Sequence, residues 1–221
     1  ALSYSPSNLA INVTYYWKVV ATDPSGSVTS SVMNFTYMGA MWIYETGDDA
    51  RTVAISADGE YIAAGSYDDK VYLFDKESRA PLWSYSTDGY LFSVAISADG
   101  EYIVAGTKED SEMVYLFNRN SSTPVWNYSV GDTVRSVAIS ADGQYIVSGS
   151  QDEKVRFFHR SSNTPLWSYT AGHNIYSVAI SSDGEYIVAG SLDKKIYLFH
   201  KDSSTPLWSY TTGDYVWSVA I

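Results

Sequence analysis

The chain of 221 residues contains no cysteine, which excludes disulfide bridges, zinc–thiolate sites and cysteine nucleophiles. It has no apolar run approaching the roughly 18 residues that a membrane-spanning helix requires. Basic residues are also few, because 14 Lys and Arg stand against 25 Asp and Glu and give a formal net charge of −11. Nucleic acids bind clustered Lys and Arg, so this composition argues against a nucleic-acid partner.

What the chain does contain is a repeat. A Trp recurs at Trp42, Trp83, Trp126, Trp167 and Trp208, which by subtraction is every 41 to 43 residues. The segments between these Trp residues are near copies of one another, built around Ser-Val-Ala-Ile-Ser-Ala-Asp-Gly-Glu-Tyr-Ile-Val-Ala-Gly-Ser. A period near forty indicates propeller blades, solenoid turns or another repeat array.

Within one period the pattern predicts strands, and no window has the periodicity of an amphipathic helix. Segments 166–169, 175–181, 186–190 and 195–199 are short, rich in β-branched and aromatic residues, and separated by Gly, Asp, Ser and Pro. The Asp-Gly pairs predict a hairpin turn, since Gly adopts positive φ without steric cost; they are Asp58-Gly59, Asp99-Gly100, Asp142-Gly143 and Asp183-Gly184. Each repeat is therefore expected to form a four-stranded antiparallel sheet.

Four strands per forty residues are typical of an all-β fold, the β-propeller. Gly172-His173 followed by Ser177 to Gly184, and the turns at Gly149-Ser150-Gln151-Asp152 and Gly190-Ser191-Leu192-Asp193, resemble the WD40 family. The family's Trp-Asp dipeptide is replaced by pairs such as Phe74-Asp75, and its His survives only at His173. The family's His–Asp hydrogen-bond network is therefore expected to be missing.

The spacing of the repeat Trp residues resembles a second family. Asp75 to Trp83, Asn118 to Trp126, His159 to Trp167 and His200 to Trp208 are each eight apart, similar to the tryptophan-docking motif of pyrroloquinoline-quinone-like propellers. That resemblance implies that each Trp wedges between adjacent blades. We interpret residues 41–221 as a hybrid WD40/PQQ-like propeller, an architecture that hosts many unrelated functions.

Residues 1–38 lie outside the repeat. Tyr15-x-Trp17-x-Val19-x-Ala21, the turn Asp23-Pro24-Ser25-Gly26 and a second strand from Ser31 to Thr36 resemble the C-terminal part of a fibronectin type III domain. The alternative is a degenerate propeller blade. It is disfavoured by the missing Asp-Gly hairpin and Pro-Leu-Trp elements.

Counting strands predicts about four complete blades. If the Trp-bearing strand is outermost in each blade, segments 41–46 and 217–221 are left over as strands of unfinished blades. We therefore expect an incomplete part of a ring of six to eight blades, in which unpaired strand edges promote self-association.

Chemical motifs are scarce. The carboxylate groups at Asp48-Asp49, Asp68-Asp69 and Glu109 to Glu112 lack the spacing of a calcium loop, and the three His residues occupy ordinary repeat positions. We therefore predict no metal, no cofactor and no enzymatic activity. A fibronectin-like module joined to a propeller resembles the modular surface proteins of prokaryotes, archaea especially. This resemblance, together with four Asn-x-Ser/Thr sequons, favours an extracellular or cell-surface location.

One position varies between blades that are otherwise nearly identical. Directly before the Ser/Thr-Val-Ala-Ile segment stand Arg51, Phe92, Arg135, Tyr176 and Trp217, each following an apolar residue. Arg, Tyr and Trp are enriched at binding hot spots, and in propellers the start of the inner strand opens on the face around the central channel. We predict that these five residues bind a protein or cell-surface ligand; neutral variation at an exposed edge is the competing explanation.

Three functional classes follow. The expected one is a non-enzymatic binding or scaffold module of a larger surface protein. The alternatives are a self-associating structural element of a cell-surface assembly and a quinoprotein-like dehydrogenase.

Overall fold

The computed structural model describes residues 13–17, 20–23, 26–29, 33–37, 42–108 and 111–221. The chain divides into two compact units, Ala1–Ile43 and Tyr44–Ile221. All described regular structure is β-strand, as the sequence pattern predicts.

The described strands of the first unit are β1 (Val13–Trp17), β2 (Val20–Asp23), β3 (Gly26–Thr29) and β4 (Met33–Tyr37). Strand β1 pairs with β4 and β2 pairs with β3, both antiparallel. The register of the second pair joins Asp23 to Gly26. A relation of residues 1–38 to a fibronectin type III domain stays a prediction.

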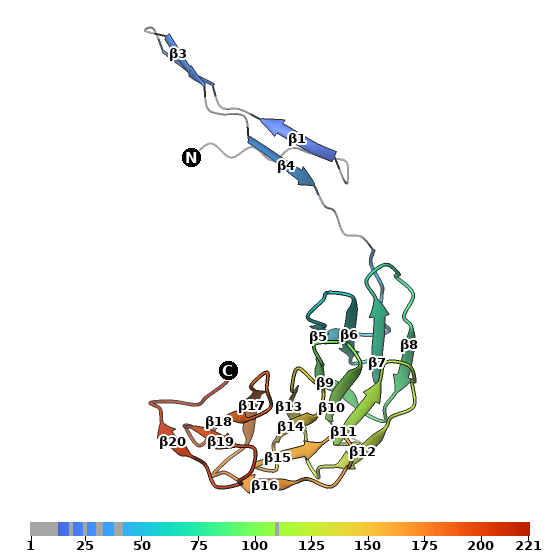
Figure 1. The fold of residues 1–221 in the computed structure, drawn as a ribbon, viewed down its shortest axis with the longest axis vertical. Coiled ribbons are helices and arrows are strands. Elements are labelled where there is room, and N and C mark those ends of the chain that lie inside the picture. Colours follow the sequence, from blue (N-terminus) through green and yellow to red (C-terminus); the bar gives the residue numbers. More distant parts are fainter. Residues whose placement is uncertain (1–12, 18–19, 24–25, 30–32, 38–41, 109–110) are drawn as a thin grey trace. The chain divides into compact units, whose positions relative to one another are not determined.

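The second unit consists of four antiparallel four-stranded sheets, each a propeller blade (Figure 1). In every blade the strands follow one another in chain order, so that the Trp-bearing strand lies at the outer edge. Blade 1 is β5 (Ala50–Ile55), β6 (Tyr61–Ser66), β7 (Lys70–Asp75) and β8 (Trp83–Ser86). Blade 2 is β9 (Tyr90–Ile96), β10 (Tyr102–Lys108), β11 (Met113–Asn118) and β12 (Trp126–Ser129).

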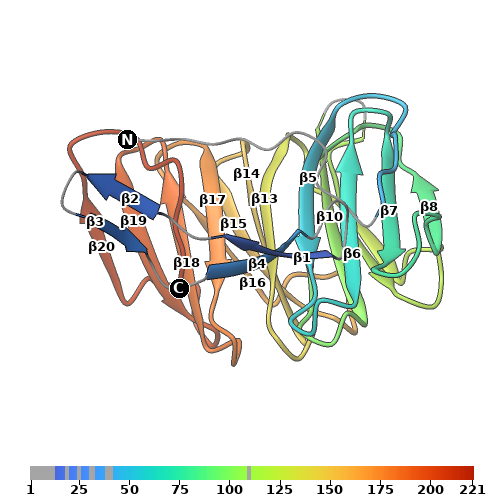
Figure 2. The same cartoon turned by 90° about the horizontal axis from the view of Figure 1, so that it is seen from above.

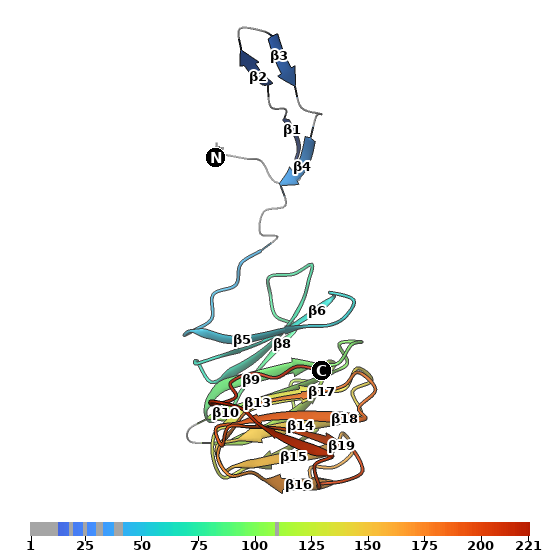
Figure 3. The same ribbon diagram turned by 90° about the vertical axis from the view of Figure 1, so that its left-hand side faces the viewer.

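Blades 3 and 4 repeat the arrangement. Blade 3 is β13 (Val134–Ile139), β14 (Tyr145–Ser150), β15 (Lys154–His159) and β16 (Trp167–Thr170); blade 4 is β17 (Ile175–Ile180), β18 (Tyr186–Ser191), β19 (Lys195–His200) and β20 (Trp208–Thr211). The inner strands β5, β13 and β17 stand in this order along the unit in Figure 2, and Figure 3 shows β9 between β5 and β13.

The predicted Asp-Gly turns form the loops between the first and second strands. Gly143, for example, has φ of +67°, and its N–H donates to the Ser140 carbonyl. A Cβ at this glycine would lie 2.8 Å from the Tyr102 ring of the preceding blade. Glycine is therefore required here both by the backbone conformation and by the packing of the preceding blade.

Apolar residues form three cores, one between each pair of neighbouring blades. Alternate residues of a strand pack into different cores, because successive side chains point to opposite faces of the sheet. In β10, Ile103 and Ala105 pack toward blade 1, whereas Val104 packs toward blade 3. The near-continuous apolar runs of the repeat reflect this burial on both faces.

The repeat Trp residues connect one blade to the next, as the PQQ-like resemblance implies. Trp167 Nε1 donates to the Lys201 carbonyl at 2.7 Å, and its ring lies 5.3 Å from that of Phe199. Trp83 and Trp126 make the same two contacts with blades 2 and 3. These three side chains are partly buried.

The inner strands are joined by a second repeated contact. The backbone N–H of Val178 donates to the hydroxyl of Ser136 in the preceding blade at 3.1 Å. The N–H groups of Val94 and Val137 donate to Thr52 and Ser93 in the same way. In blades 2, 3 and 4, a Ser or Thr hydroxyl of the preceding blade therefore accepts a hydrogen bond from an inner-strand N–H.

The expectation of strands at 41–46 and 217–221 is wrong for the described residues, because 42–46 and 217–221 adopt no strand conformation. A strand exists only where a neighbour completes its backbone ladder. Instead, Tyr44 packs its ring against Phe74 at 5.1 Å, and the Val219 N–H donates to the Ser177 hydroxyl. Both segments thus make the side-chain contacts of the repeat without its strand pairing.

Candidate functional site

Four of the five variable positions lie where the inner strands are irregular, and the fifth, Trp217, follows blade 4 outside any strand. Strand pairing shifts register between Ala50 and Thr52 in blade 1 and between Ile175 and Ser177 in blade 4, with equivalent shifts in blades 2 and 3. The unpaired residue of each β-bulge is Arg51, Phe92, Arg135 or Tyr176. A bulge redirects a side chain away from the regular pleat, which explains how this position escapes the inter-blade core.

The residue before each bulge anchors it. Ile175 is fully buried, and a Cβ built on Gly149 of the preceding blade would lie 2.5 Å from its Cγ2. Leu91 and Val134 lie equally close to Gly65 and Gly106. An apolar residue of varying size therefore packs over a constant glycine in each of these blades, and the residue after it lies outside this packing.

The structure brings the five variable residues into one continuous row, which we call the arginine–aromatic row: Arg51, Phe92, Arg135, Tyr176 and Trp217. The guanidinium carbons of Arg51 and Arg135 lie 4.9 and 4.7 Å from the centroid of the Phe92 ring. Arg135 also lies 4.7 Å from the Tyr176 ring centroid. The Tyr176 ring meets Trp217 edge-on, with centroids 4.7 Å apart.

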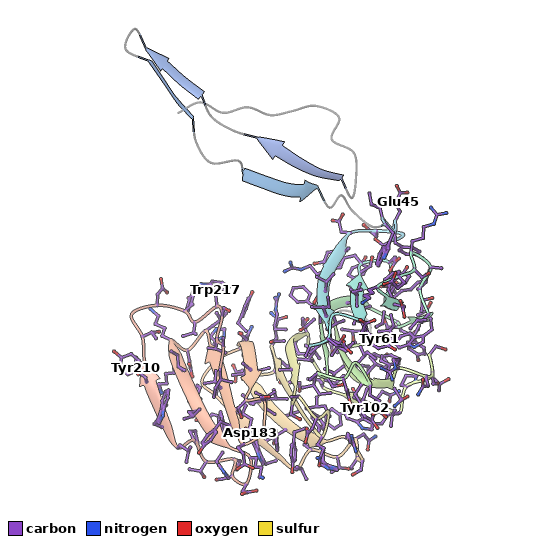
Figure 4. All side chains as sticks on the ribbon, turned by 45° about the horizontal axis from the view of Figure 1, so that its top comes forward. Glu45, Tyr61, Tyr102, Asp183, Tyr210 and Trp217 are labelled. Carbon is purple, nitrogen blue, oxygen red and sulfur yellow. The ribbon has the colours of Figure 1, made fainter. Side chains whose placement is uncertain are left out.

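The row is accessible along its length. Arg51 is exposed, Trp217 is 59 % exposed, and the three residues between them are partly buried. Trp217 and Asp183 mark opposite ends of blade 4 in Figure 4, so the row and the Asp-Gly loops occupy opposite edges of the unit.

Neither arginine of the row has a charged partner among the described residues. Arg156, in contrast, forms a buried ion pair with Asp152, and Lys201 pairs with Glu185. The Nε atom of Arg135 is buried and makes no hydrogen bond within the described structure. Stacking on rings occupies the flat faces of a guanidinium, while a carboxylate would bind its N–H edge.

Further residues flank the row and were not predicted from the sequence. Lys108 lies over the rings of Tyr67, Tyr90 and Phe92 at 5.7 to 5.8 Å. Beyond the other end, the Tyr215 ring lies 6.0 Å from that of Trp217. These positions also differ from blade to blade, so the same variability could have identified them.

The opposite edge is structural, because its contacts repeat in the blades. Arg160 packs on Tyr102 at 4.9 Å, and Arg119 packs on Tyr61 in the same way. Burial by itself raises the pKa of the Asp142 carboxyl, but hydrogen bonds from the Ser140 hydroxyl and the Gln144 N–H lower it below its ordinary value. These turn aspartates stabilise loops and lie away from the row.

Aspartates near the row side of the blades are also committed to local structure. The Asp193 carboxylate accepts hydrogen bonds from the Tyr197 hydroxyl and the Gly172 N–H. The pKa of the Tyr197 hydroxyl is raised, mainly by burial and secondly by its hydrogen bond to Asp193. His173 instead accepts from the N–H of Asn174, so a Tyr–Asp–Gly arrangement stands where the WD40 resemblance would place a His–Asp pair.

The described residues contain no group of three or more His, Cys, Asp or Glu that could hold a metal ion. Glu109 and Asp110 of the predicted acidic clusters lie outside the described residues. Within the described part of the chain there is also no helix of the length and apolar character needed to cross a membrane.

Comparison with protein families gives a match that covers most of the chain. The model of the family described as outer membrane protein assembly factor BamB matches residues 17–219. No curated protein matches the chain.

Proposed function

The chain belongs to the PQQ-like repeat family described as outer membrane protein assembly factor BamB, and on this basis we propose that it is a non-enzymatic, protein-binding propeller module. The observation that carries the proposal is the arginine–aromatic row. It is a continuous, accessible surface made only of residues that differ between otherwise near-identical blades. An assembly factor acts by contacting other proteins, which is consistent with a surface rich in Arg, Tyr and Trp.

The physical argument rests on preorganisation. The rings of Phe92 and Tyr176 hold Arg135 between them, so little side-chain entropy remains to be lost when a partner binds. Each bulge is anchored on a packed blade, which gives the row a rigid support. Rigid aromatic and Arg anchors are the groups that dominate interface energetics.

The test is to place a photocrosslinking amino acid at Tyr176 and, separately, at Ser168 on the exposed outer strand, and to identify partners in the source cells. Arg135→Ala should weaken binding of a crosslinked partner about fivefold or more, the usual hot-spot threshold. Arg160→Ala is the matched control, because Arg160 also stacks on a ring but at the opposite edge. Partners that crosslink equally at both positions and bind both variants alike would refute the proposal.

We further propose that the protein works at the cell surface or outside the cell. Support comes from the four Asn-x-Ser/Thr sequons, of which Asn120 and Asn127 are exposed. Labelling intact source cells with a membrane-impermeant reagent and then isolating the protein tests this. Labelling only after cell lysis would place the protein inside and refute the proposed location.

The second candidate function is a structural element that self-associates, and the end blades favour it. Trp208 and Tyr210 of blade 4 are 48 % and 65 % exposed, whereas the equivalent Trp167 and Tyr169 pack against the next blade. Figure 4 shows Tyr210 at this end of the unit. On blade 1, Val53 is 71 % exposed, although its counterparts in the other three blades are buried.

These two apolar faces are complementary, because the chain forms the same contact three times between its own blades. A second copy could therefore dock blade 1 on blade 4, giving a head-to-tail assembly. Sedimentation of the chain at tens of micromolar should reveal oligomers that Tyr210→Ser weakens. A monodisperse monomer under these conditions would eliminate this candidate.

A quinoprotein-like dehydrogenase is the remaining alternative. Such an enzyme needs residues to hold a quinone and its metal ion, and the described residues contain no cluster of metal-ligating side chains. We therefore derive no catalytic step for this chain. Reconstitution with pyrroloquinoline quinone and Ca²⁺, followed by an assay of dye reduction with alcohols and sugars, would detect this activity.

A further inference from the structure

We propose that the arginine–aromatic row recognises an extended acidic peptide with two carboxylates at positions i and i+2 and an apolar or aromatic residue beside them in its sequence. This inference rests on the proposed protein-binding function and names the chemistry of the partner. It follows from the charge, the spacing and the asymmetry of the row.

The charge of the row is the first argument. The chain has 25 acidic and only 14 basic residues, yet neither Arg51 nor Arg135 contacts a carboxylate among the described residues. Both guanidinium groups contact rings instead. Because the two terminal Nη atoms of each group have no carboxylate partner in the described part of the chain, each group can still bind a carboxylate through two parallel hydrogen bonds from these atoms, although the Nε of Arg135 is buried.

The distance between the two arginines limits how far apart the two carboxylates of the ligand can be. Both guanidinium carbons lie within about 5 Å of the same Phe92 centroid, and so at most about 10 Å apart. In an extended peptide, side chains at i and i+2 project from one side about 6.5 Å apart. Two such carboxylates can therefore reach the two forks at once, with the peptide passing over the edge of Phe92.

The two ends of the row differ in chemistry. The cations lie toward blade 1, whereas Tyr176, Trp217 and Tyr215 form an aromatic cluster at the other end. The edge-on contact of Tyr176 leaves much of the Trp217 ring exposed. An apolar or aromatic side chain beside the two carboxylates in the peptide would pack there.

An extended segment also fits the arrangement of the supporting strands. Four residues of the row come from one equivalent position on successive inner strands, and Trp217 continues the line by contacting Tyr176, so the five form a single file rather than a broad groove. A helix would present a wider face, with carboxylates at i and i+4. This difference makes the spacing of carboxylates a direct test.

The experiment measures binding of short fluorescein-labelled peptides to the full chain by fluorescence anisotropy. The probe has the sequence Gly-Ser-Asp-Val-Asp-Val-Phe-Gly; one comparison peptide has both Asp replaced by Asn, and another carries the two Asp four positions apart. We expect the i,i+2 probe to bind at least about tenfold more tightly than either comparison peptide, because two charge-assisted hydrogen-bonded pairs are lost or misplaced.

Variants assign the site. Arg51→Ala and Arg135→Ala should each weaken probe binding about tenfold. Arg135→Lys should also weaken it, since a Lys keeps the charge but loses the planar fork. Arg160→Ala should leave binding unchanged. Circular dichroism and thermal unfolding of each variant check that the fold is retained.

The outcomes separate the two proposals. Equal binding of the Asp and Asn peptides, or binding insensitive to Arg51 and Arg135, would overturn the acidic-peptide inference. Preference for the i,i+4 peptide would assign the row to a helix, and tighter binding of a single-stranded oligonucleotide would assign it to nucleic acid; both overturn it. If cellular partners still crosslink at Tyr176 in these cases, the protein-binding function stands.

Discussion

Trp167 and Trp208 offer an internal comparison of the same side chain with and without a neighbouring blade. Both stand in the sequence Thr-Pro-Leu-Trp-Ser-Tyr-Thr. Trp167 stacks between Phe157 and Phe199 at 5.1 and 5.3 Å and donates a hydrogen bond to blade 4. Trp208 is 48 % exposed. Replacement by Ala should therefore have different consequences at the two positions.

The magnitudes follow from the contacts. Removing a buried Trp costs about 3 to 5 kcal/mol. Because Trp167 is only partly buried, we expect about 3 kcal/mol for Trp167→Ala, of which the lost hydrogen bond to the Lys201 carbonyl contributes about 1 kcal/mol. Trp208→Ala removes only contacts within its own blade and should cost about 1 kcal/mol. Trp167→Phe keeps the stacking, loses the hydrogen bond and should fall between the two.

The assay is urea-induced unfolding followed by far-ultraviolet circular dichroism, since tryptophan fluorescence would itself be altered by the substitutions. Protein concentrations are kept in the low micromolar range so that self-association does not protect Trp208. The expected difference of about 2 kcal/mol corresponds to a clear separation of midpoints. Equal destabilisation by the two Ala substitutions would refute the role of Trp167 as a contact between blades.

Three further predictions concern the packing and the loops. Gly149→Ala should destabilise the fold by about 1 to 3 kcal/mol, because its Cβ would lie 2.5 Å from the Ile175 side chain; an unchanged melting temperature would contradict this close packing. Ser148→Ala should stabilise by about 1 kcal/mol, because its buried hydroxyl has no hydrogen-bond partner in the described structure; a lower melting temperature would reveal such a partner. The folded-state pKa of Asp142 lies below its ordinary value of 3.8, so its contribution to stability is present above that pH and is lost as the pH falls through the folded pKa. Asp142→Asn should therefore unfold with a shallower dependence on pH below about pH 5, and an unchanged acid limb in urea titrations would exclude this role.

The repeat itself could be predicted from the sequence because its signals are local. The Trp spacing, the short apolar segments and the Asp-Gly pairs determine four strands per repeat, and the all-β blades agree with this prediction. The variability of Arg51, Phe92, Arg135, Tyr176 and Trp217 against a constant background also singled out these positions. That they bind a partner stays a prediction.

The contacts of the row were decided by the tertiary structure. A bulge arises when one inner-strand residue is left unpaired opposite its neighbour, and single-strand patterns do not encode that register. The stacking of Arg135 between Phe92 and Tyr176 joins residues about forty positions apart on three blades. Such contacts depend on how the blades pack, so the sequence indicated the positions but not the contacts between their side chains.

The segments beside the blades also show a difference between what the local sequence predicts and what tertiary packing produces. The pattern of residues 42–46 and 217–221 is that of a strand, and local propensity alone predicts strands there. Neither forms one, because a strand requires a neighbour to complete its hydrogen-bond ladder. The amino-acid sequence by itself determined what each segment can become, and tertiary packing decided which ones did, since backbone pairing is a non-local interaction.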